Sequence, residues 1–231
     1  MSAARVPIHI AERLISPAEP ELEAARVLGG SWGPTRILYR CGLNGSCDGP
    51  NHVQFNSTIN RLILGDERYF LSAKVLGTKE PPQHTVIVRP GDKVQISAVV
   101  VNDAEFPGPG STADGTRFRL TVPANSAKVM PISGYISAEN AQPSYVYDSL
   151  YLRSDERFSV EYLSGSAMLV PSSTPGESHL SDRVVEEGTP IGYQDPNGIF
   201  PGCECDSATV ELDLYIESPK PSPPEEATSV N

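Results

Sequence analysis

Positive charge is scarce in this 231-residue sequence, where 18 lysines and arginines stand against 29 aspartates and glutamates for a formal net charge of −11. No cluster of basic residues forms a patch, so we do not expect nucleic acid as a partner. Long apolar runs are also missing, because no purely apolar run exceeds four residues, as at 98–101. A membrane-spanning helix needs about 20 such residues, so we expect no transmembrane segment.

Signatures of catalysis are equally scarce. The sequence holds no G-x-S-x-G nucleophile elbow. A hydrolytic triad needs a base that touches a nucleophile and is oriented by a carboxylate. The histidines lie scattered, near predicted turns or strand ends; they are His9, His52, His84 and His179. We therefore predict no catalytic residues, no enzymatic activity and no cofactor.

Two acidic segments need a closer look. The turn at 195–198 offers oxygen ligands that Asp182 and Asp206 could join to hold calcium. The EF-hand pattern is incomplete, so we interpret this segment as a proline-containing turn and predict no metal site. The segment 65–68 gathers opposite charges, which favours an ion pair at a strand entry over a catalytic carboxylate pair. A metal-dependent enzyme built on the cysteine and carboxylate loops is kept as an alternative.

Proline and glycine are plentiful, with 22 and 19 residues, which is typical of many short strands joined by turns. Several segments alternate apolar and polar residues, as antiparallel strands with one buried face do. These segments are 93–102, 117–122, 158–162 and 210–217. We therefore predict an all-β, antiparallel sandwich domain over residues 32–217.

Residues 1–31 form a separate arm in this interpretation. Alternating apolar residues predict a short strand, and capping signals predict a helix over residues 17–28. An apolar strand should be covered, so we predict that the arm adds to a sheet edge of a protein partner, with packing on its own domain as the alternative. The candidate contact residues are Val6, Ile8, Ile10, Leu22 and Leu28. The tail, 218–231, is predicted to be disordered.

Four cysteines occur as two close pairs, Cys41 with Cys47 and Cys203 with Cys205. An even count favours disulfides and an oxidising compartment, and we predict at least one intramolecular bridge. A bridge between Cys203 and Cys205 would close a strained loop, so pairing across the two clusters is an alternative. A zinc site and free thiols are further alternatives, although neither pair has the usual zinc spacing.

Tyrosines cluster around Gln142 and Pro143. A tyrosine combines an apolar ring with a polar tip, which suits a protein or carbohydrate interface. We name Tyr135, Tyr145 and Tyr147 as a candidate loop interface. The alternative is a loop that packs on its own sheet.

Short motifs follow one another in order across the predicted domain. They include Trp32-Gly33-Pro34-Thr35-Arg36, Phe55-Asn56-Ser57, Gly65-Asp66-Glu67-Arg68-Tyr69-Phe70, Pro90-Gly91-Asp92, Gly134-Tyr135-Ile136-Ser137-Ala138-Glu139-Asn140-Ala141-Gln142-Pro143 and Pro201-Gly202-Cys203. This order resembles a family of largely uncharacterised secreted or cell-surface proteins of actinobacteria and related Gram-positive bacteria. Residues 88–102 also resemble the start of immunoglobulin-like bacterial surface repeats. The resemblance implies an immunoglobulin-like β-sandwich outside the cytoplasm.

These observations predict a non-enzymatic extracellular or cell-surface module, binding or structural, that engages a protein partner through its arm. An adaptor subunit of a secreted multi-protein assembly, such as an antibacterial toxin particle, is the alternative. A carbohydrate ligand is a weaker alternative to a protein. The first residues lack the apolar segment of an export signal, so a cytoplasmic location is the alternative to secretion.

Overall fold

The computed structural model describes residues 32–42, 47–105, 108–202 and 207–219. These residues form an all-β, mostly antiparallel fold, which confirms the predicted fold class at that level. Their helical content is one short 3-10 helix, η1 (Asp182–Val184). The predicted arm, its helix and most of the predicted tail lie outside the described residues.

The strands vary widely in length. Their bounds are β1 (Trp32–Gly33), β2 (Leu71–Val75), β3 (Thr85–Ile87), β4 (Lys93–Val101), β5 (Arg117–Thr121), β6 (Ala127–Ser137), β7 (Tyr145–Tyr162), β8 (Met168–Pro171), β9 (Ser178–His179), β10 (Thr189–Pro190) and β11 (Ser207–Glu217).

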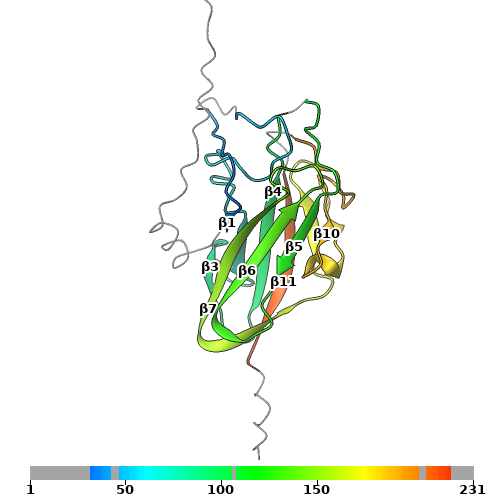
Figure 1. The fold of residues 1–231 in the computed structure, drawn as a ribbon. Helices are drawn as coiled ribbons and strands as arrows, with labels where there is room; N and C mark the ends of the chain where they lie inside the picture. The colour runs from blue at the N-terminus through cyan, green and yellow to red at the C-terminus, as the bar shows by residue number, and fades with distance from the viewer. Residues whose placement is uncertain (1–31, 43–46, 106–107, 203–206, 220–231) are drawn as a thin grey trace, which may run out of the picture.

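Strand β7 connects two sheet regions. Its first part pairs with β6, and the sheet continues through β5 to β10. Its last part pairs with β11, and the sheet continues through β4 to β2. In Figure 1, β5, β6 and β7 lie in front of β4 and β11, so the two regions form separate layers. Strands β1 and β3 add to β7, and β3 does so in parallel.

Alternating side chains from both regions fill the core. On β4, Val94, Ile96, Ala98 and Val100 are fully buried, as the alternation predicted. A close contact joins the layers at Gly134 of β6, where a Cβ atom would lie 2.9 Å from the Leu71 side chain of β2. Glycine at this position therefore allows Leu71 to fill the space between the layers, and a larger residue would overpack it.

The register of β5, β6 and β7 sets which residues face outward. Phe118, Ile136 and Val146 are buried, so the residues beside them in sequence point to the opposite face. Two cross-strand rows result on that outer face. One contains Arg119, Tyr135 and Tyr147, and the other contains Arg117, Ser137 and Tyr145.

Candidate functional site

An open groove of about 380 Å³ lies on the outer face of β5 and β6, beside the start of β7. We call it the tyrosine–arginine groove. It is lined by Arg117, Arg119, Tyr135, Ser137, Tyr145, Glu187 and Gly188. The cross-strand rows supply the first five of these residues, and the segment leading into β10 supplies the last two.

The structure brings the three candidate tyrosines together. The ring centroid of Tyr135 lies 6.4 Å from that of Tyr145 and 5.9 Å from that of Tyr147. The rings are tilted against one another, and Tyr145 is 46% exposed. They stand on β6 and β7, whereas the sequence interpretation had placed them on a loop. Tyr147 is partly covered by β1, since a Cβ atom at Gly33 would lie 2.6 Å from its ring.

Two arginines complete the groove. The guanidinium carbon of Arg119 lies 4.4 Å from the centroid of the Tyr135 ring, within the range of a cation–π contact. Arg117 donates from Nη2 to the backbone oxygen of Gly188 at 2.7 Å. The groove carboxylate, Glu187, lies 3.4 Å from Arg183, which is not a lining residue. Sequence reasoning missed both arginines as site residues, although the alternation in 117–122 had placed them on one face.

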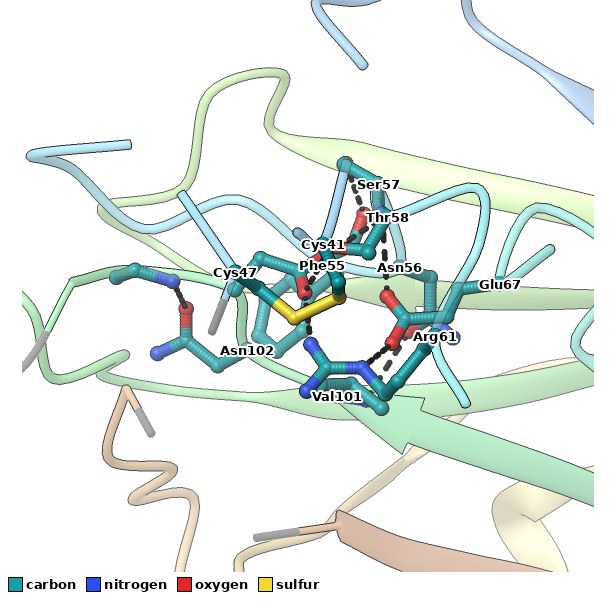
Figure 2. Close-up of polar contacts among 12 residues, drawn as sticks. Cys41, Cys47, Phe55, Asn56, Ser57, Thr58, Arg61, Glu67, Val101 and Asn102 are labelled. Atoms are coloured by element: carbon teal, nitrogen blue, oxygen red, sulfur yellow. Dashed lines mark hydrogen bonds and ion pairs between the residues drawn. A yellow bond between two sulfur atoms is a disulfide. The ribbon is translucent and has the colours of Figure 1, made fainter. Parts of the chain in front are cut away.

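A buried polar cluster lies elsewhere, between the segment 56–67 and the end of β4 (Figure 2). Arg61 bonds the carboxylates of Glu67 and Asp103, and its Nη2 atom lies 2.8 Å from Oδ1 of Asp103. Both carboxylate side chains are 1% exposed. Asp103 also accepts from the amide of Ser57 at 2.5 Å and the hydroxyl of Thr58 at 3.0 Å. We call Glu67, Asp103 and Arg61 the buried acid cluster.

Burial dominates the electrostatics of this cluster. It raises the pKa of Glu67 from 4.5 to about 9, with a further rise from the Asp103 carboxylate, and Arg61 opposes both. The raised pKa favours a proton on Glu67, beside the Asp103 carboxylate. The carboxyl groups of Glu67 and Asp103 bond to Arg61 and to the backbone amides of residues 57 and 58. The cluster therefore has the contacts of a structural brace rather than of an acid–base catalyst.

The ion pair predicted within 65–68 is confirmed. Nη2 of Arg68 lies 2.5 Å from Oδ2 of Asp66, just before β2 begins. The guanidinium of Arg68 also lies 4.4 Å from the ring centroid of Trp32. These contacts attach the first described residues to the loop that precedes β2.

Arg36 makes a second attachment of this kind. It donates from Nε to the Ser57 hydroxyl at 2.9 Å and from Nη2 to the Asn56 oxygen at 2.6 Å. Burial lowers the pKa of Arg36 to about 10, which leaves it charged at neutral pH. Residues of the Trp32–Arg36 motif thus hold the loop around 56–57 in place.

Asp148 is a further buried acid. Its Oδ2 atom accepts from the Leu71 amide at 2.8 Å, and its Oδ1 atom accepts from the Ser149 amide at 2.8 Å. Burial raises the pKa of Asp148 well above its usual range. His84 lies 3.9 Å away, and burial lowers the pKa of His84. These contacts link β7 to the start of β2.

Cys41 and Cys47 form a disulfide, which confirms the predicted intramolecular bridge (Figure 2). Because both sulfurs are used, pairing of this cluster with the other cysteines does not occur. Asn60 fixes the bridge from outside, accepting from the Cys41 amide at 2.7 Å and donating to its carbonyl at 3.0 Å. Cys203 and Cys205 lie outside the described residues.

Replacing both Cys41 and Cys47 by serine is expected to lower the free energy of unfolding by about 2 kcal/mol, the entropy-based value for so short a loop. Urea denaturation with and without dithiothreitol measures this. The reductant should bring the wild type to the level of the variant and leave the variant unchanged. If the reductant destabilises the variant by the same amount, the stabilising bridge lies elsewhere.

One exposed apolar turn was not predicted. Arg61 pairs with Gly65 across a tight turn, which leaves Leu62 and Ile63 93% and 90% exposed. The buried acid cluster anchors this turn through Arg61. Two adjacent aliphatic side chains form only a small apolar patch, and small patches are common on protein surfaces. This turn therefore serves below as a reference surface.

The other predicted positions divide into two groups. The segment 195–198 bends, with a hydrogen bond from the Asn197 amide to the Asp195 oxygen at 2.7 Å, and Gly198 has the expected positive φ, +84°. Asp182 accepts from the Tyr162 hydroxyl at 2.8 Å and the Gly165 amide at 2.7 Å. Among the residues that the structure describes, no three His, Cys, Asp or Glu side chains are placed to hold a metal ion. The second group lies outside those residues: Val6, Ile8, Ile10, Leu22, Leu28 and Asp206.

Comparisons with protein-family models, curated proteins and solved structures gave no match. The resemblance to secreted actinobacterial proteins therefore stays a prediction. The described part of the chain contains no helix of the length and apolar character that a membrane crossing requires.

Proposed function

We propose that this chain is a non-enzymatic binding module of immunoglobulin-like sandwich type that engages a protein partner outside the cytoplasm. The observation that carries the proposal is the tyrosine–arginine groove. Tyrosine and arginine are enriched in protein interfaces and dominate their energetic hot spots. Here both residue types converge on one open concave surface, and Tyr145 is nearly half exposed.

Other features support the remaining parts of the proposal. Two layers joined by β7, with alternating side chains buried between them, favour a sandwich. The bridge between Cys41 and Cys47 favours an oxidising compartment, because disulfides are rare in the cytosol. The buried acid cluster bonds internally, which favours a structural role for its carboxylates over catalysis.

The arm is proposed as a second contact element, through Val6, Ile8 and Ile10. A module with two contact elements would also suit an adaptor subunit of a secreted assembly. Deleting residues 1–31 separates the two elements. If the groove is the main contact, the deletion leaves most of the partner binding in place.

Capture from culture fluid of the source organism tests the proposal. The wild type is compared with a Tyr135→Ser, Tyr145→Ser variant, and captured proteins are quantified by mass spectrometry. We expect at least one protein to be lost about 30-fold or more, because a hot-spot residue contributes about 2 kcal/mol or more. Circular dichroism verifies that the variant is folded.

A Leu62→Ser, Ile63→Ser variant is the matched control, because it removes two exposed apolar side chains away from the groove. It should capture the same proteins as the wild type. The proposal fails if the groove variant captures them equally well, or if the control loses them and the groove variant does not.

A further inference from the structure

Arg117 and Arg119 carry uncompensated positive charge in the groove. Neither forms an ion pair with a residue that the structure describes. The acidic lining residue, Glu187, is itself paired with Arg183. This arrangement stands out on a chain with a formal net charge of −11, where acidic neighbours are abundant. Arg117 is exposed and Arg119 is half-buried, and guanidinium groups that no carboxylate pairs attract an anionic ligand.

The two arginines are held in different ways. Arg119 lies over the Tyr135 ring, which holds the guanidinium group at the groove, while its N–H groups bond no described residue. Arg117 uses Nη2 on the Gly188 oxygen, which steadies the side chain and leaves its other donors to a ligand. A guanidinium fork matches a carboxylate with two parallel hydrogen bonds. Both guanidinium groups therefore have N–H donors available to bind a carboxylate.

The spacing of the arginines narrows the ligand class. Arg117 and Arg119 are two positions apart on β5, so their attachment points lie about 7 Å apart. Alternate side chains of an extended peptide have the same spacing. A ligand with acidic residues at positions i and i+2 can therefore place one carboxylate on each arginine, with its remaining side chains near Tyr145.

The backbone edge of β5 is already paired, so a peptide ligand would be recognised through side chains. Arg117 and Phe118 pair with Pro190 and Thr189 of β10, and Glu186 donates to the oxygen of Leu120. A peptide cannot add a strand at positions that are already paired. It can lie across the outer face instead, where the tyrosine rings and guanidinium groups point.

We infer that the tyrosine–arginine groove binds an extended acidic peptide segment of a protein partner, with Asp or Glu residues at alternate positions paired with Arg117 and Arg119. This inference rests on the proposed function, in which the groove is the protein-binding surface. It adds the chemistry and the spacing of the contacting segment.

Selection from a random peptide display library tests the inference without a known partner. Peptides are selected on the full-length wild type, and the binding of each enriched peptide is then compared between the wild type and an Arg117→Gln, Arg119→Gln variant. We expect the enriched peptides to carry Asp or Glu at i and i+2. For a synthetic peptide of the enriched sequence, measured by fluorescence anisotropy, Arg119→Gln should weaken binding about tenfold or more, as expected for charge-assisted hydrogen bonds.

Two controls separate the outcomes. Arg89→Gln alters an exposed arginine that does not line the groove, so it should leave the affinity unchanged. If selected peptides depend on Tyr135 and Tyr145 but are not acidic, the inference fails and the groove still binds protein. If no selected peptide depends on any groove residue, both proposals fail. If polygalacturonate binds through Arg119 and no peptide is selected, the ligand is an acidic glycan and the peptide inference is wrong.

Discussion

Replacing Arg61 by alanine is expected to lower the free energy of unfolding by about 3–5 kcal/mol, the range for removing one partner of a buried ion pair. Arg61 contacts two carboxylate side chains that are each 1% exposed, and its own side chain is 12% exposed. Without it, the Asp103 carboxylate would stay buried with hydrogen bonds from Ser57 and Thr58 but with no cation.

Urea denaturation followed by circular dichroism measures this loss. Arg183→Ala is the matched control, because it also breaks an Arg–Glu pair, but one whose side chains are 72% and 66% exposed. Exposed pairs contribute about 0.2–1 kcal/mol at most, so this control should remain close to the wild type. Equal losses in the two variants would contradict a bracing role for the buried acid cluster.

The strands that bury only one face could be predicted, because apolar and polar residues alternate regularly along them. The predicted segment 93–102 corresponds to β4, and 210–217 corresponds to most of β11. The prediction at 158–162 recovered only the end of β7, which begins at Tyr145. The missing part has consecutive buried residues, Asp148, Ser149 and Leu150, because β7 lies in the middle of its sheet and passes on to the second layer. Two-sided burial removes the alternation that sequence reasoning needs.

In the candidate sites, contacts between neighbours in sequence could be predicted, and contacts between residues far apart in sequence could not. The bond between Cys41 and Cys47 and the pair of Asp66 with Arg68 involve close neighbours in sequence, and both could be predicted. The link between Arg61 and Asp103 spans 42 residues and depends on how β4 ends. The arginines join the tyrosines only through the register of β5 against β6. Register follows from core packing and turn geometry, which one sequence does not specify.

Stability should fall as the pH rises from about 6.5 to 9, because the folded state holds a proton on Glu67 that the unfolded state releases. Burial and the Asp103 carboxylate raise the pKa of Glu67 from 4.5 to about 9. Its contribution to stability is therefore complete below pH 4.5 and is lost progressively as the pH approaches 9. Asp148, whose pKa is also raised by burial, acts in the same direction. The pKa of His84 is lowered by burial, so His84 influences stability only at pH values below its usual pKa of 6.5.

The expected slope is up to about 1.4 kcal/mol per pH unit for one such group. Urea denaturation of the wild type at several pH values between about 6.5 and 9 measures it. Glu67→Gln should reduce the slope and stabilise the protein at the upper end, because the amide keeps the size of the protonated side chain and cannot ionise. Glu187→Gln, which alters an exposed carboxylate, should leave the slope unchanged. A wild type whose stability is constant over this range, or a Glu67→Gln variant that keeps the full slope, would show that Glu67 is already ionised in the folded protein and that Arg61 outweighs burial.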